Sequence, residues 1–386
     1  MCKNIKAFDT SNSPATEGDS KYKPDISFYD IGTGDSDSRL TSFQRMEMFV
    51  EFKYGNTSDP FHVEGKQSFE KHFETTCATR GQIALYATRL QTYQFRTWVF
   101  SIGIFGNVAR LFRWDRAGAI ISEPIYYTKG GNRELAEFLW RYDRLDRVQR
   151  GFDPTVFDAT KEEAAAFDNA IKSAVTEGNR VLLKGLIDSV GNNVDYPRKR
   201  IDTLSEDEQV ESYVVGRPIA IAGSPTGRAT RGFVAMSRTG ELVFLKDSWR
   251  PDIPGMMGEG HWFKRLEKSR NICALVHGSE VKCVVAEPSS TKSDPFQRTV
   301  TNVHAKHYKE HATMIGYIHY RTVQRELYVP LHMFKDSKHL VQIMLDIAKG
   351  TSLLSSASLQ SLNPSQQWRI CMRKESFIAI SALRTS

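Results

Sequence analysis

Residues 227–246 read GRATRGFVAMSRTGELVFLK, a glycine-containing turn followed by apolar runs that end on Lys246. Glycine has no Cβ, so Gly227 and Gly232 allow the backbone to lie close to a bound group. Short apolar runs next to glycine-rich turns are typical of β-strands. The stretch therefore predicts a loop that covers phosphates, followed by a strand with a lysine at its end. The alternative is an ordinary β-hairpin that carries a surface ion pair.

The surrounding residues extend this pattern into a candidate ATP site. Gly227 to Val234 follow the form GxGxxGxV, the glycine-rich loop of protein kinases, with Ala229 in place of the middle glycine. The Cβ of Ala229 obstructs one backbone approach, and Val234 would pack on the adenine. Glu259 opens a segment with helical apolar spacing and would hold Lys246, the lysine that binds phosphates in such a site. The expected ATP-binding residues are Gly227, Ala229, Gly232, Val234, Lys246 and Glu259.

Length and composition favour a two-domain protein. The chain has 386 residues, of which 40% are hydrophobic, so it is long enough for two cores. Its formal net charge of +7 fits acidic partners such as nucleic acid only weakly, because the basic residues are spread over the whole length. The five cysteines form no CxxC pair, and no apolar run approaches 18 residues. We therefore expect an intracellular protein, cytoplasmic or nuclear, with no membrane partner.

The spacing of apolar residues and the positions of turn-forming residues predict an α+β fold in several segments. We expect a disordered tail over 1–23, an N-terminal α/β domain over 24–184, and a linker or insertion over 185–216. Within the N-terminal domain the order strand, helix, strand, strand is expected, with a hairpin at Gly106-Asn107 and two further helices. The strands are MEMFVEFKY, TWVFSIGIF and VARLFRWDR, and the helices are RGQIALYATRLQTYQ, LAEFLWRYDRL and EEAAAFDNAIKSAV.

Several long motifs are similar to those of one family. RGQIALYA, FGNVARLFRWDRAGAIISEP, LAEFLWRYDRL, GRATRGFVA and FLKDSWR occur in this order, and with them the chain resembles the fungal-type protein kinase family from about Pro24 to Lys349. The resemblance implies a kinase-like N-lobe and the start of a C-lobe over 217–349. It also implies ATP and magnesium as cofactors and an unidentified protein as the substrate of phosphorylation. By this resemblance YRTVQRELYVPLHMF contains the hinge and KHLVQIMLDIAK begins the C-lobe.

The catalytic segments of a kinase are missing from these 386 residues. Phosphoryl transfer in kinases uses an HRDxxxxN loop and a DFG aspartate, and neither HRD nor DFG occurs in the sequence. Codons permitted for Ser376–Ser381 can spell His-Arg-Asp in a neighbouring frame. We therefore expect 350–386 to be an aberrant, disordered tail and the chain to be a truncated, inactive kinase. A pseudokinase that serves as a non-catalytic scaffold is the alternative.

The N-terminal domain carries a pattern of a different class. Pro24-Asp25, followed later by Glu51-Phe52-Lys53, matches the PD-(D/E)xK arrangement of metal-dependent nucleases. Asp25 and Glu51 would bind magnesium, and Lys53 would orient the attacking water. Gln82 and Tyr86 are four residues apart and share one face of the expected helix. The alternative is an ordinary surface strand with alternating charges, which would contain the same pattern of residues.

Overall fold

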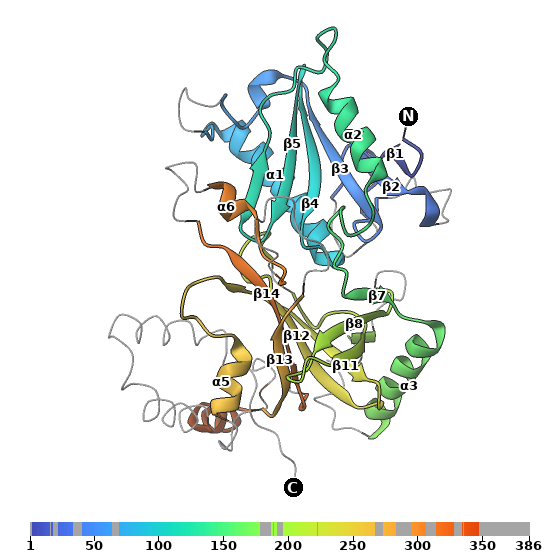
Figure 1. The fold of residues 1–386 in the computed structure, drawn as a ribbon, viewed down its shortest axis with the longest axis vertical. Helices are drawn as coiled ribbons and strands as arrows, with labels where there is room; N and C mark the ends of the chain where they lie inside the picture. The colour runs from blue at the N-terminus through green and yellow to red at the C-terminus, as the bar shows by residue number, and fades with distance from the viewer. Residues whose placement is uncertain are drawn as a thin grey trace.

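The computed structural model describes two β-sheets, one above the other in Figure 1, each with helices packed on it. The described residues are 2–15, 17, 22–33, 41–63, 69–177, 187, 189–190, 196–221, 223–266, 273–282, 295–305, 314–327, 334 and 336–346. The expected tail over 350–386 lies outside them. No helix among these residues combines the length and the apolar composition that crossing a membrane requires.

The first sheet has helices on both faces. Its strand order is β1-β2-β3-β4-β5-β6, and only β3 and β4 run parallel. The helix α1 connects these two strands, because parallel neighbours need a long crossover. Ile83 and Leu90 of α1 pack on one face, and Phe138 and Tyr142 of α2 pack on the other. The bounds are β1 Ile5–Asp9, β2 Ile26–Asp30, β3 Met46–Lys53, β4 Val99–Phe105, β5 Val108–Asp115, β6 Gly118–Ile121, α1 Glu74–Tyr93 and α2 Glu134–Arg144, with short 3-10 turns at Ile31–Thr33 and Asn56–Ser58.

The second sheet is antiparallel throughout. Its strand order is β13-β14-β12-β11-β9-β8-β7, and the short β10 pairs with β11. Helices α3 and α5 flank it in Figure 1. The bounds are β7 Val156–Asp158, β8 Lys199–Leu204, β9 Val210–Val215, β10 Ala220–Ile221, β11 Arg231–Ser237, β12 Leu242–Pro251, β13 Leu275–Glu280, β14 Tyr317–Gln324, α3 Lys161–Glu177, α5 Glu259–Arg265 and α6 Thr301–Ala305. Residues 337–346, in the segment expected to begin the C-lobe, are also helical.

Hydrogen bonds join the two sheets at the turn between β5 and β6. Asp115 accepts hydrogen bonds from the backbone N–H groups of Val300 and Thr301 at the start of α6. The carbonyl oxygen of Arg116 accepts a hydrogen bond from Gly227 N at 2.8 Å. Its guanidinium contacts Gln91 of α1 and the carbonyl oxygen of Pro225. The loop before β11 is therefore anchored on the first sheet.

A buried charge network lies behind this junction. Asp247 of β12 accepts hydrogen bonds from Arg231, Arg321 and His319, and Arg321 reaches Asp153 at 2.5 Å. The positive charges around Asp247 hold the pKa of its carboxyl well below the usual value, against the opposing effect of burial. Such a network is stable only when each charge keeps its partner, so it fixes β12 and β14 against the chain around Asp153.

Two expected segment boundaries differ from the structure. Ile5–Asp9, expected in a disordered tail, form β1 and pair with β2. Asp143 of α2 accepts hydrogen bonds from the backbone N–H groups of Lys3, Asn4 and Ile5, which holds this segment in place. The expected linker over 185–216 contains β8 and β9, and β7 and α3 also pack on the second sheet rather than the first. Distant partners stabilise these short polar strands, which their composition alone does not reveal.

Candidate functional site

A lysine and a glutamate form a closed ion pair on the second sheet. Lys246 lies in β12, and its Nζ donates hydrogen bonds to Oε1 and Oε2 of Glu259, at 2.8 Å each. Glu259 is the first residue of α5 and is 8% exposed. Arg228, which the sequence pattern did not single out, lies 3.8 Å from the same carboxylate. Strand, loop and helix thus bring two cations around one buried carboxylate.

The loop residues lie on the same sheet face as Lys246. In the pairing of β11 with β12, Gly232 is opposite Lys246 and Val234 is opposite Phe244. Directly paired residues of antiparallel strands share a face, so these four residues look to one side of the sheet. Gly227 and Ala229 precede β11, with φ values of 88° and 41°. Ala229 therefore adopts a left-handed conformation that glycine would occupy at lower cost.

Phe244 and α3 cover part of this face. Phe167 and Ile171 of α3 form a buried cluster with Val234, which is 3% exposed. A Cβ at Gly232 would lie 2.8 Å from Cζ of Phe244, so the phenyl ring packs directly on this glycine. In the VAIK strand of kinases the residue two before the lysine is alanine. Phe244 stands at that position here. A phenylalanine in place of the alanine was a sequence signal that this sheet face is partly filled, and it was not recognised from the pattern.

The first sheet brings the second set of predicted residues together. Asp25 directly precedes β2, and Ile26 pairs with Val50, so Asp25 lies beside Glu51 of β3. Lys53 Nζ donates hydrogen bonds to Oε1 of Glu51 at 2.6 Å and to Oε1 of Gln82 at 2.8 Å. Gln82 in turn donates to the hydroxyl of Tyr86, also on α1, at 3.0 Å. The four side chains form one connected chain of hydrogen bonds.

Glu51 is the most perturbed group of this cluster. It is 2% exposed, and its Oε2 has no hydrogen-bond partner among the described residues. Burial raises the pKa of Glu51 to about 7, with a smaller contribution from the negative charge of Asp25, while Lys53 opposes the shift. A carboxylate oxygen buried without a donor or cation carries a desolvation cost.

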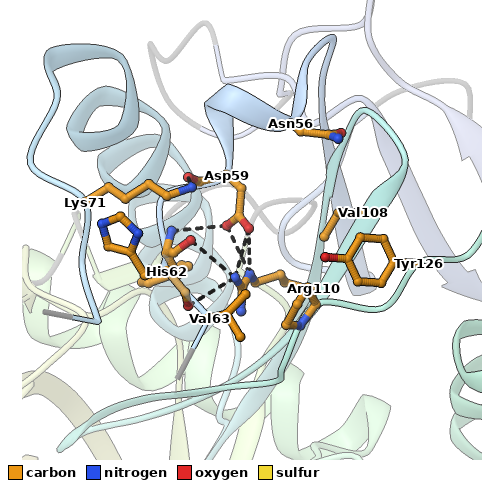
Figure 2. Close-up of a pocket in the computed structure, with 10 residues that line it drawn as sticks. Asn56, Asp59, His62, Val63, Lys71, Val108, Arg110 and Tyr126 are labelled. Carbon is orange, nitrogen blue, oxygen red and sulfur yellow. Dashed lines mark hydrogen bonds and ion pairs between the residues drawn. The ribbon is translucent and has the colours of Figure 1, made fainter. Parts of the chain in front are cut away.

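A pocket of about 270 Å³ lies beyond the end of β3 (Figure 2). Its walls include Asp59, Lys71 and Arg110. Figure 2 shows Arg110 against Asp59, with Nε and Nη2 donating to the carboxylate at 2.9 to 3.0 Å, while Lys71 donates to the backbone carbonyl of Asp59. Arg110 and Asp59 neutralise each other, so this part of the pocket wall is a structural ion pair.

One comparison with known proteins identifies a family. A family model described as fungal protein kinase matches residues 61–359. No curated protein and no solved structure gives a significant match. The matched range contains Lys246, Glu259 and Gln82, whereas Asp25, Glu51 and Lys53 precede it.

Proposed function

The chain belongs to the fungal protein kinase family, and on this premise we propose that its second sheet is a nucleotide-binding lobe. Lys246 would hold the phosphates of ATP, and Glu259 would hold Lys246. The closed Lys246–Glu259 pair is the observation that carries this proposal. Among the described residues it is the internal ion pair that a kinase needs before its lysine can act on a nucleotide.

The strand order supports the same role. Lys246 lies on β12, which pairs with β11 on one side and with β14 on the other, and α5 lies between β12 and β13 in the chain. A glycine-containing loop before β11, a lysine on the next strand and a glutamate on the following helix then converge on one sheet face. This convergence favours a phosphate site over an ordinary hairpin, because a hairpin needs no buried carboxylate behind its lysine.

For this chain we propose nucleotide binding without phosphoryl transfer. Transfer requires a general base and aspartate or asparagine ligands for magnesium, and the 386 residues contain no HRD and no DFG segment. Lys246 and Glu259 position charge but supply neither a base for the substrate hydroxyl nor that set of metal ligands. Magnesium would therefore reach this lobe together with the nucleotide phosphates.

Because α3 packs on the sheet face that carries Lys246, it limits how the adenine of a nucleotide could bind there. In the GxGxxGxV pattern the valine packs on adenine, but Val234 packs on Phe167 and Ile171 of α3. We therefore expect the phosphates to contribute most of the affinity and the base to contribute little while α3 stays in place.

Calorimetric titration with magnesium and ATP tests the proposal. The parent chain is expected to bind, and Lys246→Met is expected to weaken binding at least about tenfold, the loss of one charge-assisted contact. Lys264→Met is the matched control, because Lys264 is an exposed lysine on the neighbouring α5. The double variant Lys246→Met, Glu259→Met avoids an unpaired buried charge and should fold but not bind. Equal affinity in the parent and in this double variant would refute the proposal.

A further inference from the structure

The first sheet carries a cluster that nucleotide binding does not use. We propose that Asp25, Glu51 and Lys53 form a magnesium-dependent site that hydrolyses phosphodiester bonds of nucleic acid. This proposal is independent of the nucleotide-binding lobe, since its residues lie on β2 and β3 and in the turn before them.

The fold fixes the three side chains from separate directions. Glu51 and Lys53 are two apart on β3 and so share one face, which α1 covers with Gln82 and Tyr86. Oδ2 of Asp25 accepts a hydrogen bond from Phe52 N at 2.7 Å, which holds this carboxyl against the middle of the Glu51-Phe52-Lys53 segment. Two carboxyls and one ammonium therefore meet at the end of a strand that is anchored on both sides.

One oxygen of Glu51 is buried and accepts no hydrogen bond from the part of the chain that the structure describes, which favours a cation site. Oε1 of Glu51 accepts from Lys53, but Oε2 has no partner in the described part of the chain, although the Glu51 side chain is only 3% exposed. No described residue donates a hydrogen bond to Oδ1 of Asp25 either. A divalent cation held by Glu51 and Asp25 would give the buried Oε2 of Glu51 a partner and offset the repulsion of the two carboxylates.

The donor set selects the metal. No group of three His, Cys, Asp or Glu side chains comes together among the described residues, so zinc, which takes three or four nitrogen or sulfur ligands, fits poorly. Magnesium fits better, because it binds through one or two carboxylates, keeps several waters and takes oxygens from a substrate phosphate. Asp25 and Glu51 supply that number of carboxylates.

The chemistry balances without an oxidant or reductant. A water oxygen forms a new bond to phosphorus as the bond from phosphorus to one sugar oxygen breaks. The water releases one proton to solvent, and the departing sugar oxygen takes one proton from solvent. A magnesium ion held by Asp25 and Glu51 would lower the pKa of the water and neutralise charge on the phosphate. Lys53, which Glu51 and Gln82 hold, would donate a hydrogen bond to the attacking water or to a phosphate oxygen.

An exposed aromatic residue at the end of β3 favours nucleic acid as the substrate. Tyr54, which follows Lys53 directly after β3, is fully exposed, and an exposed aromatic ring of this kind stacks on bases. A fully exposed ring beside Lys53 at the end of β3 suits a phosphodiester backbone with a base next to it.

Manganese titration followed by electron paramagnetic resonance tests the metal site without any activity. The parent chain should bind one ion, and Asp25→Asn should weaken that site at least tenfold, while its amide oxygen still accepts the Phe52 N–H and preserves the fold. Asp9→Asn is the matched control, because Asp9 is an exposed carboxyl at the end of the neighbouring β1. Unchanged manganese affinity in Asp25→Asn would overturn the site.

Cleavage of a single-stranded DNA oligonucleotide tests the chemistry. The parent chain and Asp9→Asn should cleave in magnesium but not in EDTA, and Asp25→Asn and Lys53→Met should lose at least about a hundredfold in rate, the scale of one acid–base or electrostatic contribution. No cleavage by the parent, or cleavage that survives Asp25→Asn, refutes the hydrolytic role. ATP binding is expected to be the same in Asp25→Asn, so failure here leaves the nucleotide proposal standing.

Discussion

Lys246 Nζ contacts both carboxylate oxygens of Glu259 at 2.8 Å, and this contact fastens α5 to β12. The helix has only seven residues, too few for much stability of its own. Gly260 N also donates to the hydroxyl of Tyr320 on β14, which adds a second tie between α5 and the sheet. The ion pair therefore positions the helix as well as the lysine.

Removing one partner of this pair should cost more than removing both. Glu259→Ala leaves the Lys246 ammonium partly buried without its main acceptor, and we expect a loss of about 3 kcal/mol in unfolding free energy. The double variant Lys246→Met, Glu259→Met should lie within about 1 kcal/mol of the parent. Urea denaturation measures both. A double variant less stable than Glu259→Ala would contradict this explanation.

Ala229 should be more stable as glycine. Its φ of 41° costs an L-residue about 1–2 kcal/mol, more than the extra entropy that glycine loses on folding. Ala229→Gly is therefore expected to raise the unfolding free energy by about 0.5 kcal/mol. Ala235→Gly in β11, where the chain is extended, serves as the control and should lower it by about 1 kcal/mol. Destabilisation by Ala229→Gly would show that the loop is not strained.

Nucleotide selectivity should reflect the position of α3. Since Phe167 and Ile171 cover Val234, we expect magnesium complexes of ATP and of inorganic tripolyphosphate to bind within about threefold of each other, a difference below 1 kcal/mol. Competition titrations measure the ratio. A preference for ATP above about tenfold would mean that α3 leaves this face when the nucleotide binds.

Acid should destabilise the second sheet through His277. Burial lowers the pKa of this side chain from 6.5, so the folded protein keeps it neutral where the unfolded chain takes up a proton. Stability from this residue is present above pH 6.5 and is lost as the pH falls below that value. The unfolding free energy should therefore drop from pH 7 to pH 5, and the drop should be smaller in His277→Gln.

The control for this pH effect is His72→Gln, since His72 is exposed ahead of α1. It should keep the slope of the parent chain. The same slope in His277→Gln and in the parent would assign the acid sensitivity to other groups.

Local pattern was enough for several elements of the first sheet and for the ion pair of the second. The helical apolar spacing around Ile83 and the alternating run of β3 both gave the observed elements, and Gly106, at a φ of 61°, makes the predicted hairpin. The Lys246–Glu259 contact followed from a motif that spans fourteen residues. Such features depend on near neighbours in sequence, whose spacing survives in the folded chain.

Tertiary structure alone decided where distant segments meet. β1 is a strand because Asp143 and β2 satisfy its backbone, and α3 packs on Val234 although it precedes β11 by more than fifty residues. The sequence by itself determined which side chains could bind phosphate or metal, since that is a matter of chemical type. Only the fold decided that Glu51 Oε2 is buried beside Asp25 with no donor among the described residues. Burial depends on contacts between segments that carry no local signal of each other.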